Sequence, residues 1–264
     1  MAGRAGGPIV TQRFIHALAL GLDPAWRRLP DTERRADGER FADAVEHPGV
    51  QTHTYSMIGL EPNADLLVWR LADSLDALEE AAAALLRVGL GRWLSVRESF
   101  LGLIGNSQYV ARPTQQEQSL FEGERSRYII VYPFTKSNDW YLLSKEVRQG
   151  VMNGHMRVGH QYPQVRQLLG YSFGLDDQDF LVAYETDDLP AFGALVRDLR
   201  GTESRRSTVR DTPILTAVHR PVREILGLLG AFDVPANANP GGPATSDAAG
   251  AAHATPREPL GTHP

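Results

Sequence analysis

The order of strand-like and helix-like segments is the feature that most constrains the fold of this chain. Strand, helix, two strands, helix and strand follow one another in the first half, and the same order returns in the second half. This βαββαβ order is the ferredoxin-like pattern. We therefore predict an α+β protein of two tandem ferredoxin-like halves, whose sheets pack face to face or close into a barrel with the helices outside.

The first series of expected elements is a strand at 9–20, a helix at 30–46, strands at 52–59 and 65–71, a helix at 74–87 and a strand at 95–104. The second series is a strand at 128–133, a helix at 144–161, strands at 165–172 and 180–185, a helix at 189–200, a strand at 213–218 and a closing helix at 221–229. Ser74 is expected to cap the helix that follows it, because a serine hydroxyl can accept from the free N–H groups of a first turn.

Composition sets the limits of the folded part. Residues 1–7 are rich in Gly and Ala, and residues 233–264 hold almost no large apolar side chain, so both are expected to be disordered. Between them we expect an N-terminal half at 8–111, a polar connector at 112–127 and a C-terminal half at 128–232.

Composition also excludes several classes of protein. The chain has no cysteine, which rules out disulfides and thiolate metal sites, so a metal would have to be held by His or carboxylate. The net charge of −5 argues against nucleic acid as a partner. No apolar run approaches the roughly 18 residues that span a bilayer, and no secretory signal precedes the first element, so we expect a cytoplasmic protein without a membrane contact.

One histidine stands out on the helix expected at 144–161. Val147, Val151, His155, Val158 and Tyr162 recur at spacings of three and four and form one stripe, which is expected to face the core. A residue five positions further along lies about 140° around the helix, so the histidine at 160 should face outward. The stripe is consistent with a buried ligand to a metal, but also with an ordinary core histidine.

Two further patterns leave alternatives open. The segment 132–141, YPFTKSNDWY, can be a strand-to-helix loop that Trp140 anchors in the core. Alternatively, it places the phenol of Tyr132, the cation of Lys136 and the indole of Trp140 beside a flat acidic ligand. The C-terminal region is also rich in arginine, which indicates either a solvated, salt-bridged face or a site for carboxylates. The arginines are Arg197, Arg200, Arg205, Arg206, Arg210, Arg220 and Arg223.

Several of these segments together resemble the chlorite dismutase family. The resemblance spans roughly 50–230 and is densest over YPFTKSNDWY, the helix that carries His155, VRQLLGYSFGLDD, FLVAYETDDLPAF and RGTESRRSTVRDTPILTAVHRP; SMIGLEPNADLLVWR and LIGNSQYV add to it. It implies a fold of the dimeric α+β barrel type, haem bound in the C-terminal half, and homo-oligomers that are often pentamers. It further implies that His155 is the proximal ligand of the iron, with Trp140 nearby and Glu203 within reach of its outer nitrogen.

The side of the haem opposite the proximal histidine separates the branches of this family. Chlorite dismutases carry an arginine there, whereas decarboxylases of iron-coproporphyrin III (coproheme) of the Gram-positive type carry a glutamine, and Gln167 matches that position. The gap from His155 is one residue shorter than is usual in the family. A slip of the strand by one residue would turn Arg166 to this side instead.

The resemblance implies the decarboxylating branch, in which hydrogen peroxide and coproheme are the substrates and haem b is the product. Tyr132 matches a tyrosine that relays a radical to the reacting propionate, and Lys136 a lysine beside that propionate. Arg210, and Tyr109 with Asn106, match contacts to the other propionates. The alternatives are a chlorite dismutase, a haem-dependent peroxidase, or a haem-binding protein without catalysis.

Overall fold

The structure is a computed structural model that describes residues 13–105 and 124–232. The chain divides into two units, residues 1–233 and 234–264, and every described residue belongs to the first. Within the described residues, no helix has both the length and the apolar character needed to cross a membrane.

The N-terminal half is a four-stranded antiparallel sheet with the strand order β4-β1-β3-β2. Its elements are β1 (Arg13–Leu22), η1 (Pro24–Arg28), α1 (Asp31–Val45), β2 (Val50–Ser56), β3 (Leu66–Ala72), α2 (Leu75–Leu86), η2 (Gly89–Trp93) and β4 (Leu94–Ile104). The hydroxyl of Ser74 accepts from the N–H of Ala77, so the expected cap of α2 is confirmed.

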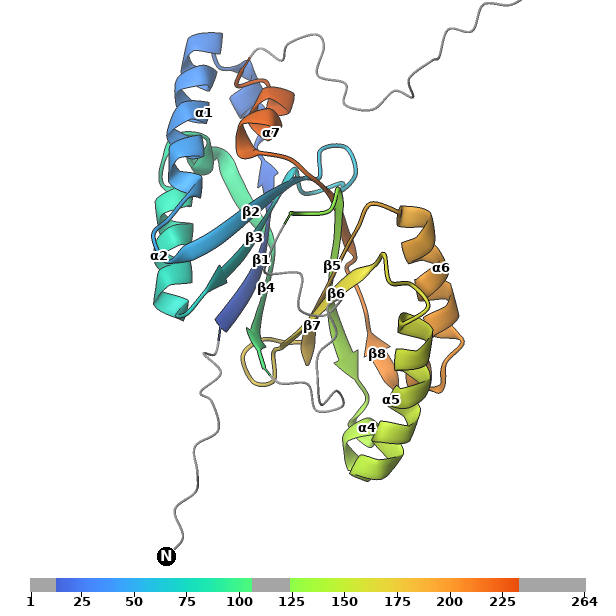
Figure 1. The fold of residues 1–264 in the computed structure, drawn as a ribbon. Coiled ribbons are helices and arrows are strands. Elements are labelled where there is room, and N and C mark those ends of the chain that lie inside the picture. Colours follow the sequence, from blue (N-terminus) through green and yellow to red (C-terminus); the bar gives the residue numbers. More distant parts are fainter. Residues whose placement is uncertain (1–12, 106–123, 233–264) are drawn as a thin grey trace, which may run out of the picture. The chain divides into compact units, whose positions relative to one another are not determined.

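The C-terminal half repeats this arrangement in the order β9-β5-β7-β6. Its elements are β5 (Tyr128–Lys136), α4 (Asn138–Leu142), α5 (Lys145–Gly159), β6 (Arg166–Tyr171), β7 (Phe180–Thr186), α6 (Leu189–Arg200), η3 (Glu203–Ser207), β8 (Thr208–Arg210), β9 (Leu215–His219) and α7 (Val222–Leu229). Figure 1 shows α1 and α2 beside the strands of the first half, and α5 and α6 beside those of the second.

The two sheets join into one closed ring of strands. β4 pairs with β6 at Leu103 and Tyr171, and β2 pairs with β9 at Tyr55 and His219. The pairing of β7 with β5 then closes the ring, and the short strand β8 lies outside it at the edge of β5. The predicted fold class, two ferredoxin-like halves of the barrel type, is therefore confirmed.

Strand alternation sorts the side chains of the ring into an inner and an outer set. Ile129 and Val131 of β5 lie in the core inside the ring, which both halves share. Ile130 and Tyr132, which directly follow these two residues on β5, belong to the core beneath α5 and α6. A separate core, which includes Trp26 and Phe41, lies beneath the helices of the other half.

The strand expected to end at Pro133 continues to Lys136. Proline lacks the N–H that a central strand needs. Here the missing donor costs no ladder bond, since β9 pairs with β5 only as far as Val131 and β8 begins to pair at Thr135. The proline therefore sits in a gap between two neighbouring strands.

A buried carboxylate ties the two halves together inside the ring. The hydroxyl of Tyr55 on β2 donates to Glu185 Oε1 on β7 at 2.7 Å, and both residues are fully buried. Arg166 Nη2 donates to Oε2 at 2.6 Å, and Arg125 Nη1 to Oε1 at 3.5 Å. Burial raises the pKa of Glu185, and the Tyr55 hydrogen bond and the two arginines oppose that rise.

We expect Tyr55→Phe to lower the free energy of unfolding by about 1–3 kcal/mol, because it leaves a buried carboxylate one donor short. Urea denaturation followed by circular dichroism would measure the loss. Tyr162→Phe is the matched control, since its hydroxyl binds Asp198 at an exposed position and should cost less than about 1 kcal/mol. Equal losses in the two variants would contradict a role for the buried position.

Candidate functional site

The candidate site lies where α5 packs against the outer face of the second sheet. Tyr132 of β5 and Tyr184 of β7 belong to the core on this face. Gln167 of β6 pairs with Tyr184 in the ladder and so points to the same side. His155 enters from α5, whose first turn is capped by the hydroxyl of Ser144.

His155 is held as a neutral imidazole. Burial, and after it the charge of Lys136, lowers its pKa to about 4. Its Nδ1 is buried and has no hydrogen-bond partner among the described residues, so the expected contact from Glu203 is not formed, and Glu203 is exposed. His160 is exposed, as the helical spacing predicted.

The apolar stripe of α5 is only half covered by protein. Val158 and Tyr162 pack on the core as predicted, but Val147 is 50% exposed, so the prediction that the stripe faces the core is wrong at this end. Leu169 on the outer face of β6 and Phe173 just after it are 42% and 46% exposed. Large apolar side chains exposed in one region are typical of a surface that a ligand or partner covers.

Lys136 is near enough to His155 for its charge to lower the pKa of that imidazole. Its Nζ donates to the carbonyl and to the hydroxyl of Ser204, at 2.8 and 3.0 Å, and lies 4.7 Å from the centre of the Trp140 ring. Burial, and then Arg205, lowers its pKa to about 8. The buried Trp140 thus anchors α4 and also forms one wall around this ammonium group.

Tyr132 is paired with a second tyrosine that sequence reasoning missed. Its ring stacks on that of Tyr184, with the centres 6.0 Å apart and the planes inclined by 26°. Burial, followed by the neighbouring Tyr184, raises the pKa of Tyr132 well above its usual value, while Arg200 opposes the rise. Both phenols therefore stay protonated at neutral pH. No sequence pattern indicated Tyr184, because its contact with Tyr132 depends on the register of β5 against β7.

Arg166 and Gln167 point to opposite faces of β6. Arg166 pairs with Glu185 in the ladder, and its Nη2 also donates to Ser126 Oγ at 2.9 Å and to the carbonyl of Glu124 at 3.2 Å. These contacts hold Arg166 on the inner side of the ring. The register therefore leaves Gln167, not Arg166, on the face that carries Tyr132.

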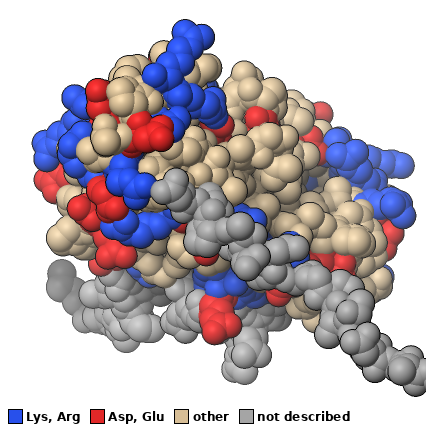
Figure 2. Space-filling model, turned by 90° about the horizontal axis from the view of Figure 1, so that it is seen from above, with Lys and Arg blue, Asp and Glu red and all other residues tan. Residues whose placement is uncertain are grey.

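The arginines of the C-terminal region do not form one cluster. Arg223 pairs with Glu39 and Asp43 of α1, and Arg220 pairs with Glu224, while Arg205 binds Asp211. Figure 2 shows the Lys and Arg side chains of the visible face in several separate groups, with acidic side chains among them.

One arginine group does border the candidate site. Residues 200–203 with Arg205 and Arg206 line an open hollow of about 470 Å³. Of these, Arg200 opposes the rise in the pKa of Tyr132, and Arg205 contributes to the lowered pKa of Lys136. Arg210 lies across from Thr135, is exposed, and donates its Nε to the carbonyl of Thr212. Asn106 and Tyr109 lie outside the described residues.

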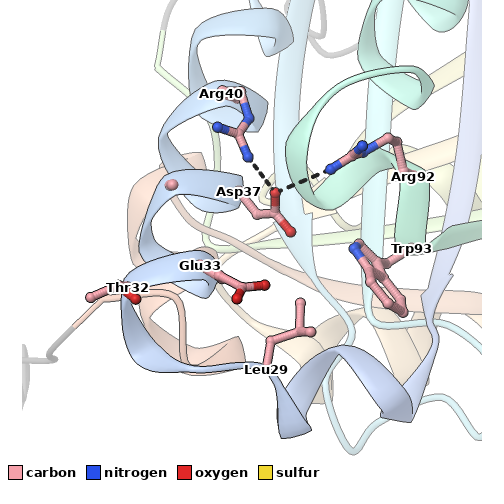
Figure 3. A pocket seen from close by; sticks show the side chains of 8 residues that line it. Leu29, Thr32, Glu33, Asp37, Arg40, Arg92 and Trp93 are labelled. Atoms are coloured by element: carbon pink, nitrogen blue, oxygen red, sulfur yellow. Dashed lines mark hydrogen bonds and ion pairs between the residues drawn. The ribbon is translucent and has the colours of Figure 1, made fainter.

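A second hollow, of about 360 Å³, lies in the N-terminal half (Figure 3). Its central carboxylate, Asp37, accepts from Trp26 Nε1 at 3.2 Å and Arg40 Nη2 at 2.7 Å, and pairs with Arg92 at 3.6 Å. Gly89 (φ +48°) allows the close approach, since a Cβ there would lie 2.2 Å from the Asp37 carbonyl. This network holds η2 against α1 and engages both carboxylate oxygens of Asp37.

We expect His155 to titrate at about pH 4 and its pKa to rise in Lys136→Met, which removes the nearby positive charge. The rise should be only partial, because burial is the larger cause. Histidine carbon–proton NMR signals followed across pH 3–8 would measure it. Lys145→Met, an exposed lysine on the same helix, should leave the pKa unchanged. A His155 pKa near 6.5 in the unsubstituted protein would contradict its burial.

Comparison with known proteins agrees with this arrangement. A family model described as chlorite dismutase matches residues 29–220. The coproheme decarboxylase of Mycolicibacterium smegmatis is 32% identical over 208 residues, which is 75% of this chain and 87% of that relative.

Solved structures of the chlorite dismutase of Candidatus Nitrospira defluvii superpose on the same fold. One, a complex with imidazole, and one of a mutant are 28% and 29% identical, each with a TM-score of 0.76, and the match covers 83% of this chain and 95% of theirs. Because the family model spans most of the chain and the relatives share both halves of the ring, the protein belongs to the chlorite dismutase family.

Proposed function

We propose that the C-terminal half binds an iron porphyrin and that His155 would be the protein ligand that holds the iron. Three features of the described residues support this. His155 carries a neutral imidazole, the protonation state that binds a metal. Its buried Nδ1 lacks a partner among the described residues, and large apolar side chains of α5 and of the outer face of β6 are exposed.

A porphyrin also suits the ligands that the chain offers. No group of three or more His, Asp or Glu side chains in the described ranges could hold a metal ion by itself. A lone histidine therefore suits a metal that arrives with most of its ligands already in place. A porphyrin supplies four nitrogen ligands, and a protein histidine supplies a fifth.

We propose that the reaction is the oxidative decarboxylation of coproheme to haem b by hydrogen peroxide. The observation that carries this choice is the position of Gln167 and Tyr132 on one face, with Arg166 bound to Glu185 on the other. A cation beside the iron would suit an oxyanion such as chlorite. A neutral amide and a protonated phenol instead suit the removal of a hydrogen atom from a propionate side chain.

The overall chemistry balances with peroxide as the oxidant. Each propionate becomes a vinyl group and carbon dioxide, and gives up one proton and two electrons. Each hydrogen peroxide takes up two electrons and two protons, one from the propionate and one from solvent, and yields two molecules of water. The iron porphyrin, when bound, supplies the redox centre through which peroxide acts. Two propionates therefore consume two molecules of peroxide.

The chain's own residues have separable roles in this proposal. Tyr132 holds a phenolic proton that its buried position keeps in place, so it can give up an electron and a proton together. Arg200 lies near enough to that phenol to attract the carboxylate of a propionate. Lys136, bound to Ser204, adds to the effect of burial in keeping His155 neutral, and it orders η3 next to the helix that carries His155.

The contact of Lys136 with a substrate carboxylate stays a prediction, as do the contacts assigned to Arg210, Tyr109 and Asn106. We also propose, from the family resemblance, a homo-oligomer such as a pentamer, and a location in the cytoplasm. The alternatives, a chlorite dismutase, a peroxidase or a haem carrier without catalysis, would use the same histidine but not the phenol of Tyr132.

Titration of the purified protein with ferric coproheme, followed by stepwise peroxide and chromatography of the porphyrins, tests the proposal. We expect a Soret band at one equivalent and conversion to haem b after two equivalents of peroxide. Tyr132→Phe should bind coproheme as tightly as the unsubstituted protein does. It should convert coproheme at least about 100-fold more slowly, because a positioned proton-transfer group typically contributes a factor of that order to the rate. Tyr128→Phe, on the same strand, is the matched control and should react normally.

The substitution His155→Ala should abolish the characteristic Soret band of histidine-ligated iron. Binding without conversion in the unsubstituted protein would refute the decarboxylase and leave the peroxidase or carrier. Release of oxygen from chlorite would instead favour the dismutase.

A further inference from the structure

Tyr184 is a second phenol on the face that carries Tyr132, and the proposed function does not use it. It lies on β7, where it pairs in the ladder with Gln167 of β6 on one side and with Ile130 of β5 on the other. Tyr132 follows Ile130 by two positions on β5, so the two tyrosines are diagonal neighbours on adjacent strands. The role inferred for Tyr184 rests on the role proposed for Tyr132.

Packing holds the two phenol rings against each other. Their centres are 6.0 Å apart, and their planes are inclined by only 26°. The ring of Tyr184 also contacts that of Phe192 on α6, with the centres 5.2 Å apart. Tyr184 is 5% exposed, and Tyr132 packs on the same core. The sheet and α6 together therefore fix the ring of Tyr184 beside that of Tyr132.

Neither phenol has a base beside it that could take its proton. In residues 13–105 and 124–232, no carboxylate and no imidazole is hydrogen-bonded to either hydroxyl. The hydroxyl that influences Tyr132 through hydrogen bonding is that of Tyr184. Burial raises the pKa of both tyrosines, because it disfavours the charged phenolate. An oxidised phenol in this site therefore stays neutral only if it gives up its electron and its proton together.

We propose that Tyr184 exchanges a hydrogen atom with oxidised Tyr132, so that the two phenols share one oxidising equivalent. In this step the O–H bond of Tyr184 breaks and an O–H bond forms on the phenoxyl radical of Tyr132. Tyr132 becomes a phenol again, and Tyr184 becomes the radical. One electron and one proton move together, so no charge is created in the buried site, and the peroxide of the proposed function is the only oxidant. Tyr184 acts through Tyr132 and holds the equivalent until a propionate is in position to react.

Electron paramagnetic resonance of the full-length protein tests this exchange. The protein is loaded with haem b, mixed with hydrogen peroxide and frozen within milliseconds, so the measurement does not depend on decarboxylation. Tyr184→fluorotyrosine, with the fluorine ortho to the hydroxyl, should add a fluorine hyperfine splitting to the tyrosyl signal, because unpaired electron density reaches this ring. Tyr128→fluorotyrosine is the matched control. It should add no splitting, since four residues along β5 place it roughly 13 Å from Tyr132.

Two further measurements use Tyr184→Phe, which keeps the ring but removes the hydroxyl. With haem b and peroxide, this variant should show a single tyrosyl species, on Tyr132. In the protein without porphyrin, carbon-13 at the phenolic carbon of tyrosine reports on hydrogen bonding of the hydroxyl. The Tyr132 signal should move in Tyr184→Phe and stay in place in Tyr128→Phe.

The outcomes separate the exchange from the proposed function. A tyrosyl signal on Tyr132 without a fluorine splitting from position 184 would overturn the exchange and leave the proposed function standing. An unmoved carbon-13 signal of Tyr132 in Tyr184→Phe would do the same, because the two hydroxyls would then not be in contact. With haem b bound, the absence of any tyrosyl signal would overturn the role proposed for Tyr132 and the exchange with it.

Discussion

The closure of eight strands into one ring is the constraint on which the rest of the structure depends. A closed ring leaves no free edge, and every strand has an inner side that meets the shared core and an outer side that meets helices. Each residue of a strand is thereby committed to one side or the other. Two residues that are adjacent in the sequence of a strand therefore lie in different chemical environments.

The pair Arg166 and Gln167 shows the consequence most directly. The inner position places Arg166 against the buried Glu185, which also binds Tyr55 from the other half of the ring. The outer position places Gln167 beside the tyrosines under α5 and α6. Since the carboxylate is buried and shared between the halves, the contact that stabilises the ring also keeps the guanidinium of Arg166 off the face that carries Tyr132.

Local chemistry made much of the fold predictable. Ser74 and Ser144 cap helices through hydrogen bonds within one turn, and α6 spans the residues that its composition indicated. The short elements were missed: α4, η3 and β8 are each five residues or fewer, and their signals are weak against those of their neighbours. The strand that continues past Pro133 depended on where its neighbours stop pairing, which no local pattern contains.

For the candidate site, the sequence by itself determined the helix that carries His155, the outward direction of His160, and the two ferredoxin-like halves, because these follow from periodicity and from the order of elements. The tertiary structure decided the rest. It brought Lys136 to Ser204, stacked Tyr184 on Tyr132, and moved Arg223 away to α1. These contacts join residues that are far apart in the chain or lie on adjacent strands, and only the register and closure of the ring determine which of them meet.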